Sequence, residues 1–227
     1  MERQFAEWGV AATRIAASDG RTKNIRKFLN YEILGEIAPS RLACYASHLK
    51  AIRAFLETKA ERAVIMEDDC SFETVAHWPF TWSEAEALLP FHYDALQMTI
   101  INDRAVTVAL HRRYMNDYSS AAYLITRRYA EKLAALYFDG DRVRLNHAFN
   151  PELTSEIMLF EPGASYAMPL LSYETGFASQ LRPGHAEALH EPSRKRIMRF
   201  WREEAAKLPD WRALFRVNPA LGRLPPV

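Results

Sequence analysis

Three adjacent carboxylates follow a short apolar run near the end of the first third of the chain. The run covers residues 63–66, and the carboxylates are Glu67, Asp68 and Asp69. Carboxylates this close repel one another unless a cation lies among them, and hard divalent cations bind oxygen ligands while leaving positions for phosphate oxygens. The pattern predicts a Mg²⁺ or Mn²⁺ site for a phosphorylated ligand. The alternative is a solvated acidic turn in which Asp68 or Asp69 caps the next element.

Two elements flank this acidic turn in the sequence. Apolar residues recur every three or four positions over 41–57, which predicts an amphipathic helix starting near Pro39 and Ser40. Residues 62–66 are too few for a helix, and they are expected to form a central strand buried on both faces. Ligands bind at the carboxyl ends of strands in open α/β sheets, so the acidic turn would lie at a binding edge.

The remaining elements alternate in the order expected of an α/β fold. We expect one domain over residues 1–182, followed by a C-terminal helix and a proline-containing tail over 183–227. Further helices are predicted over 2–8, 83–89, 126–137 and 193–206, and further strands over 10–16, 93–101, 106–110, 119–125 and 166–171.

The composition excludes several classes of protein. With 49% apolar and 25% charged residues among 227, the chain is neither disordered nor a coiled coil. A net charge of +1 gives no basic field for nucleic acid, and no apolar window is long enough to span a membrane. Two cysteines, Cys44 and Cys70, predict a reducing cytoplasmic location, with no disulfide framework and no thiolate zinc site. Glycine-rich phosphate loops and a G-x-S-x-G elbow are absent from the sequence.

Four segments in order resemble glycosyltransferase family 25, which includes lipooligosaccharide and collagen galactosyltransferases. The first segment covers residues 10–20, and the second is Pro-Ser-Arg-Leu-Ala-Cys-Tyr-Ala-Ser-His-Leu-Lys-Ala-Ile over 39–52. The third is Ile-Met-Glu-Asp-Asp over 65–69. The fourth is Ala-Ala-Tyr-Leu-Ile-Thr-Arg-Arg-Tyr-Ala-Glu-Lys-Leu over 121–133. The resemblance covers roughly residues 8–180. Arg41 and Ala43 depart from it, since the family often has Glu and Gly at these positions.

The resemblance implies a GT-A fold, a nucleotide-binding α/β sandwich with a central mixed sheet. It also implies a nucleotide-sugar donor, expected to carry UDP, and a Mn²⁺ or Mg²⁺ ion held by Asp69 with Glu67 or Asp68 beside it. The family usually opens with a strand that precedes the segment at which this sequence begins. Two alternatives are open: either another start codon lies upstream, or the sheet lacks that first strand, which would leave a less complete donor site and an edge that a second chain could pair.

Five residues are candidates for contact with the donor or its nucleotide: Asp19, Ser47, His48, Gln97 and Asp117. His48 would contact the donor or the acidic turn, and its alternative is a half-buried histidine bonded to the backbone. Gln97 stands in an apolar strand, where its amide needs partners, and a sugar hydroxyl is one. The alternative for Asp117 is an ordinary turn residue. Cys44, one turn before His48, is expected to be a small core residue.

The resemblance implies that Glu156, which stands near the place of the family's late acidic residue, is the candidate general base, with Glu152 as the alternative. An inverting transfer needs a base to deprotonate the acceptor hydroxyl, and apolar neighbours of Glu156 would raise its pKa. The alternative is a surface glutamate on an amphipathic helix. The basic stretch 194–202 would either lie on an anionic membrane surface or, as we expect, pack as an ordinary helix.

These observations predict an inverting, metal-dependent hexosyltransferase of the kind found in lipopolysaccharide biosynthesis. Its substrates would be a nucleotide sugar and a hydroxyl of a glycan or glycolipid. Nucleic acid is not an expected partner, membrane contact would be peripheral at most, and self-association is left open. The alternatives are a GT-A-fold binding protein without catalysis and another metal-dependent phosphate enzyme, such as a nucleotidyltransferase.

Overall fold

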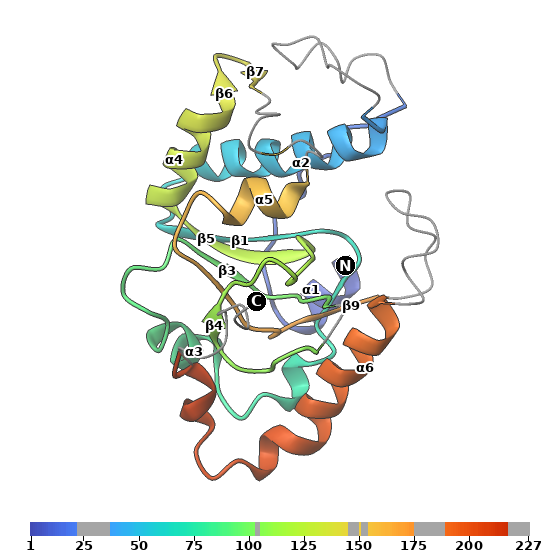
Figure 1. Cartoon of the computed structure of the whole chain (residues 1–227), viewed down its shortest axis with the longest axis vertical. Coiled ribbons are helices and arrows are strands. Elements are labelled where there is room, and N and C mark those ends of the chain that lie inside the picture. The colour runs from blue at the N-terminus through green and yellow to red at the C-terminus, as the bar shows by residue number, and fades with distance from the viewer. Residues whose placement is uncertain (22–36, 103–104, 145–149, 151–153, 175–188, 218–227) are drawn as a thin grey trace, which may run out of the picture.

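A five-stranded mixed sheet forms the centre of the protein (Figure 1). The computed structural model describes residues 1–21, 37–102, 105–144, 150, 154–174 and 189–217. The strand order is β1-β5-β3-β8-β4, with β3 and β8 parallel and the other neighbours antiparallel. The predicted α/β class with a central mixed sheet is therefore confirmed. The bounds are β1 Arg62–Met66, β3 Ala95–Gln97, β4 His111–Arg112, β5 Ala122–Thr126 and β8 Ser165–Ala167.

Helices cover both faces of this sheet (Figure 1). On one side lie α2 (Pro39–Leu56), α4 (Arg127–Tyr137) and α5 (Ser155–Phe160). On the other side lie α3 (Trp82–Ala87) and α6 (Glu191–Arg199), and α1 (Glu2–Glu7) packs through Phe5 against the same core. The predicted helices over 2–8, 41–57, 83–89 and 126–137 all form, with ends within a few residues of those expected.

The alternation of side chains along β5 explains why helices pack on both faces of the sheet. Successive residues of a strand point to opposite faces. Ala122 and Leu124 join the core under α3 and α6, whereas Tyr123 and Ile125 join the core under α2, α4 and α5. All four are buried, so burial on both faces accounts for the unbroken apolar run in the sequence.

Local capping signals set several element ends. Pro39 occupies the first turn of α2, where its missing N–H has no helical partner to lose. Thr126 accepts the N–H of Tyr129 at the start of α4, and Thr81 and Glu84 form a capping box on α3. The hairpin of β6 (Phe138–Asp139) and β7 (Arg142–Val143) turns at Gly140, whose φ of 61° suits glycine.

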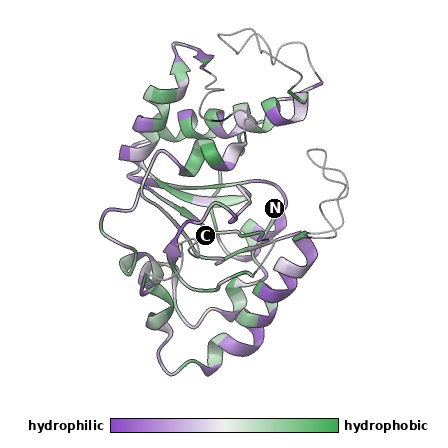
Figure 2. Ribbon diagram, in the orientation of Figure 1, coloured by the Kyte–Doolittle hydropathy of each residue, from purple (hydrophilic) through white to green (hydrophobic). Residues whose placement is uncertain are grey.

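The C-terminal part of the described chain packs into the core beside the sheet. After α6 the helix continues as a π turn over Phe200–Glu204 and 3-10 turns over Ala205–Lys207 and Trp211–Phe215, and another 3-10 turn spans Val75–His77. The rings of Trp201 and Phe215 meet Phe80 at 5.8 and 5.2 Å between centroids. Figure 2 shows the exposed side of α6 as hydrophilic, consistent with a helix that buries one stripe.

The position of β1 differs from the prediction. It was expected at the centre of the sheet, but it lies at one edge of the described sheet and pairs with β5. Arg62 and Val64 are exposed, and no residue of β1 is fully buried. An apolar run cannot distinguish an edge strand from a central one, because strand order depends on distant parts of the chain.

Four other predicted strands are wrong or too long, and one of them, expected over 166–171, is only β8. Residues 10–16 are irregular and exposed, with no strand pairing among the described residues. The strand expected over 93–101 is only β3, followed by an isolated bridge between Ile101 and Tyr118. Residues 106–110 form no strand, and β4 begins after them. The last small sheet pairs β2 (Cys70–Ser71) with β9 (Ser172–Tyr173).

Candidate functional site

Glu67 leaves the end of β1 and turns its carboxylate toward α2. Its N–H donates to the carbonyl of Ala121 at 2.7 Å, so the backbone stays attached to the neighbouring strand. Its Oε1 accepts the hydroxyl of Ser120 at 2.8 Å and lies 3.3 Å from Nε2 of His48. Of the two contacts predicted for His48, with the donor or with the acidic turn, the structure shows the contact with the acidic turn.

His48 is buried and contacts side chains rather than the backbone, which differs from the half-buried, backbone-bonded alternative. Its Nε2 lies 3.1 Å from Ser120 Oγ, and its Nδ1 lies 3.2 Å from the Tyr123 hydroxyl. Burial opposes a positive charge here, but Tyr123, Cys44 and Glu67 together raise the pKa of His48 well above its ordinary value. Burial likewise opposes the charge on Glu67, yet His48 and Ser120 lower the pKa of its carboxyl.

Cys44 completes a group that could hold a metal ion. It lies four residues before His48 on α2, so both side chains project from the same side of the helix. The ligand atoms of Cys44, His48 and Glu67 all lie within 4.8 Å of one another. Cys44 is half-buried, and its Sγ is 3.2 Å from the hydroxyl of Ser155. Sequence reasoning missed it, although the four-residue spacing to His48 was visible.

Asp69 carries the unsatisfied carboxylate of the site. Its Oδ1 is buried and has no hydrogen-bond partner among the described residues. Burial, followed by the neighbouring carboxylates of Glu67 and Asp68, raises the pKa of Asp69 to about 6, and Glu174 adds to this. Asp68 itself is exposed. The acidic turn is therefore not simply solvated, since one of its oxygens is removed from water without compensation.

Glu156 approaches the same region from α5. Its Oε1 accepts the backbone N–H of Ser119 at 3.0 Å. Ser119 has a φ of 101°, a conformation that residues with a Cβ adopt rarely. Its hydroxyl is bonded to Thr99 at 2.8 Å, which helps to hold that backbone. Glu156 thus orients the residue next to Ser120, the residue that contacts Glu67 and His48. Glu152, the alternative base, lies outside the described residues.

Gln97 and Asp117 are buried and support this loop from beneath. The Gln97 amide faces the carbonyls of residues 117, 118 and 119 at 2.8–3.0 Å, and its oxygen accepts Nε of Arg113. Asp117 accepts the N–H of Tyr114 at 2.8 Å and pairs with His111 at 3.1 Å. Gln97 and Asp117 were predicted to contact the nucleotide-sugar donor. In the structure, the polar groups of both side chains have partners within the protein.

The turn that contains Asp19 contacts Ser47 on α2 through the neighbouring residue Ser18. The N–H of Ser18 donates to Ser47 Oγ at 2.9 Å, and that hydroxyl donates to the carbonyl of Ala43 at 2.6 Å. Asp19 forms an exposed pair with Arg21, which lowers the pKa of the Asp19 carboxyl. The turn at 18–21 therefore lies beside α2, next to Ser47, the residue that precedes His48.

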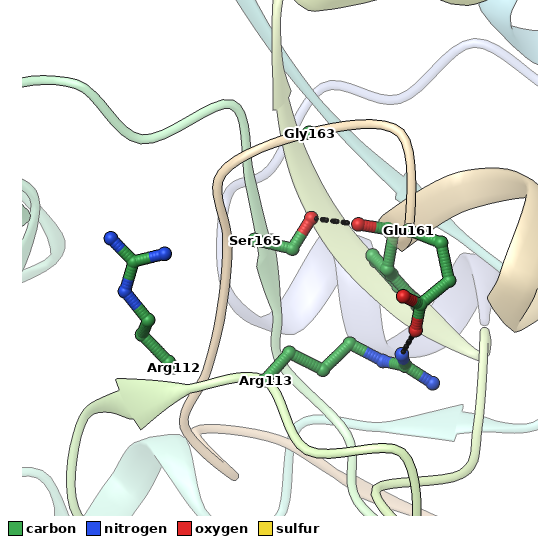
Figure 3. Close-up of a pocket in the computed structure, with 6 residues that line it drawn as sticks. Arg112, Arg113, Glu161, Gly163 and Ser165 are labelled. Carbon is green, nitrogen blue, oxygen red and sulfur yellow. Dashed lines mark hydrogen bonds and ion pairs between the residues drawn. The ribbon is translucent and has the colours of Figure 1, made fainter. Parts of the chain in front are cut away.

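A separate small hollow lies at the start of β8 (Figure 3). It holds about 120 Å³ and is lined by Arg112, Arg113, Phe160, Glu161, Gly163 and Ser165. Figure 3 shows Arg113 paired with Glu161, at 2.7 Å, while Arg112 points elsewhere. None of the carboxylates of the acidic turn lines this hollow, so it is not part of the candidate site.

The comparisons leave the family open. No model of a known protein family matches the chain, and no curated protein matches it. Among the described residues, no helix has the length and apolar character needed to cross a membrane. Among the described residues, Cys44, His48 and Glu67 form a group of potential metal ligands at the end of β1, two residues before Asp69, and Glu156 contacts the neighbouring loop through Ser119.

Proposed function

We propose that this protein is a metal-dependent, inverting hexosyltransferase of glycosyltransferase family 25 type, built on a GT-A fold. It would move a hexose from a nucleotide sugar, expected to be UDP-linked, to a hydroxyl of a glycan or glycolipid. The observation that carries the proposal is the buried Oδ1 of Asp69, which lacks a partner among the described residues at the end of β1.

The acidic turn fits a hard divalent cation at Asp69. A buried carboxylate oxygen without a donor is costly unless a cation or water compensates it. Asp68 stands beside it and is exposed, whereas the Glu67 carboxylate is directed to His48 and Ser120. Asp69, with Asp68 next to it, would therefore hold Mn²⁺ or Mg²⁺. Such an ion stabilises the negative charge that develops on a departing diphosphate.

Glu156 is the proposed base on the other side of the loop. Its attachment to the Ser119 N–H orients the carboxylate, and its half-buried position limits competition from water. Ser120, the next residue of the same loop, donates its hydroxyl to Glu67, so the proposed base and the acidic turn contact adjacent residues. Gln97 and Asp117 would shape this loop, and Asp19 and Ser47 would border the donor.

The test is calorimetric titration of UDP, UDP-galactose and UDP-glucose into the full chain, with and without Mn²⁺. We expect binding that needs Mn²⁺. Asp69→Asn keeps the shape of the side chain but removes its charge, so it should weaken metal-dependent donor binding about tenfold or more. Asp141→Asn is the matched control, because Asp141 is an exposed carboxylate paired with Arg53 away from the acidic turn.

Unchanged donor binding by Asp69→Asn would show that the metal assignment is wrong. No binding of any nucleotide by the parent protein would overturn the transferase proposal and favour a binding protein on the same fold. Metal-independent binding of nucleotides without a sugar preference would instead favour another class of phosphate enzyme.

A further inference from the structure

The group formed by Cys44, His48 and Glu67 contains a ligand set unlike that of the acidic turn. It offers a thiol, an imidazole and one carboxylate, all within 4.8 Å of one another. Sulfur and imidazole nitrogen are ligands of Zn²⁺ and similar ions, whereas Mg²⁺, Mn²⁺ and Ca²⁺ favour oxygen. Contrary to the expectation of no thiolate zinc site, we propose that this group is a Zn²⁺ site, distinct from the cation at Asp69, that joins α2 to the end of β1.

The distance between the His48 and Glu67 ligand atoms already suits a tetrahedral ion. With Zn–N and Zn–O bonds of about 2.0 Å and Zn–S bonds of about 2.3 Å, ligand atoms lie roughly 3.3–3.6 Å apart. His48 Nε2 and Glu67 Oε1 are already 3.3 Å apart. Cys44 and His48 are on neighbouring turns of one helix, so little rearrangement is needed to bring all three atoms into contact with an ion.

The charges also balance for a divalent ion in a largely buried place. One thiolate and one carboxylate supply two negative charges, and a neutral imidazole adds none, so a bound Zn²⁺ leaves the group neutral. Burying a neutral set is far less costly than burying an unpaired charge. The thiol and the imidazole would bind the ion in their deprotonated forms, as metal ligands must.

Three hydroxyl groups are arranged around the ligands. Tyr123 OH lies 3.2 Å from His48 Nδ1, Ser120 donates to Glu67 at 2.8 Å, and Ser155 Oγ lies 3.2 Å from Cys44 Sγ. Such partners fix the orientation of metal ligands and the tautomer of a ligating histidine. Three protein ligands leave the fourth position to water or to the Ser120 hydroxyl.

The experiment uses the full chain, stripped with a chelator and titrated with Co²⁺ alone. Cobalt replaces zinc and reports its ligands, because a bound thiolate gives a near-ultraviolet charge-transfer band and tetrahedral geometry gives strong visible bands. We expect one equivalent to produce both, and one equivalent of Zn²⁺ to abolish them. Excess Mg²⁺ should leave them unchanged, because magnesium binds sulfur poorly.

Matched cysteine variants locate the ion. Cys44→Ser should lose the charge-transfer band and weaken Zn²⁺ binding about 100-fold, whereas Cys70→Ser should keep the band, since Cys70 lies outside the group. His48→Gln is a second variant, expected to weaken binding similarly. Circular dichroism and thermal melting confirm that each variant is folded before titration.

A parent protein that gives no thiolate band would overturn the proposal, as would a band that survives Cys44→Ser or disappears in Cys70→Ser. These readouts need no nucleotide and no activity. Zinc binding can thus succeed while UDP binding fails, or fail while Mn²⁺-dependent UDP binding succeeds, so the two proposals stand or fall separately.

Discussion

His48 illustrates how one side chain can serve two protonation states of the same cluster. Without a metal ion, the raised pKa of His48 favours a positive ring, which would balance Glu67 across 3.3 Å. With an ion, the neutral ring would serve as a ligand, and the ion would supply the charge. Both states keep a neutral total in a place where only Glu67 and Cys44 retain partial exposure.

His111 is a second buried histidine, paired with Asp117 at 3.1 Å in the loop that leads to Ser119. Burial opposes its charge, but the bond to Asp117 and that to the carbonyl of Ala109 raise the pKa of His111 above 6.5. A raised pKa means that the folded protein holds this proton more tightly than the unfolded chain. The stabilisation is complete below about pH 6.5 and disappears as the pH rises through the folded pKa.

We therefore expect the free energy of unfolding to decline above about pH 6.5 by an amount that His111→Gln removes. Urea unfolding between about pH 6 and pH 9 measures it for parent and variant. His48 contributes with the same sign in both proteins, so the difference between them isolates His111. His77→Gln, at an exposed position, is the control and should follow the parent. Parallel pH curves for parent and His111→Gln would contradict this assignment.

At the scale of elements, β1 lies at an edge of the described sheet, and the candidate site lies at its end. Its residues pair with β5 from Arg62↔Thr126 to Met66↔Ala122. Ile65 and Ala63 pack against the core under α2, while Val64 is 38% exposed. An edge strand with one covered face can carry a site at its end, because α2 alone is enough to position His48 above Glu67.

Val64 and Leu124 face each other in this register and test the position of β1. Val64→Thr should change the free energy of unfolding by less than about 0.5 kcal/mol, because the side chain is already exposed to water. Leu124→Thr should cost about 2–4 kcal/mol, because Leu124 is buried in the core. Urea unfolding compares the two. An equal loss at both positions would show that β1 is covered on both faces.

At the scale of the whole molecule, the segment after the sheet is part of the core. Trp201 is fully buried, and its Nε1 donates to the carbonyl of Pro169 at 2.8 Å. Arg194 and Arg202 pair with Glu73, and the apolar side chains of the helix point inward. The apolar side of this helix is therefore packed in the core, as expected, and does not face outward as the alternative of membrane contact would require.

Trp201→Ala should lower the free energy of unfolding by about 3–5 kcal/mol, since it leaves a large cavity and an unpaired carbonyl. Phe91→Ala removes an aromatic ring of comparable kind that is 92% exposed, and should be neutral within about 0.5 kcal/mol. Thermal or urea unfolding measures the free energy of unfolding of both variants and of the parent protein. A stable Trp201→Ala protein would mean that the C-terminal segment does not belong to the core.

The sequence by itself determined the local elements and the residue types of the acidic turn. Helix α2 and helix α4 were predictable because periodicity, Pro39 and the Thr126 cap act within a few residues. Only the tertiary structure decided that β1 lies at an edge and that Glu67 meets Cys44 and His48. Those outcomes depend on strand order and on helix packing, which are set by contacts between distant residues and leave no periodic signal in the chain.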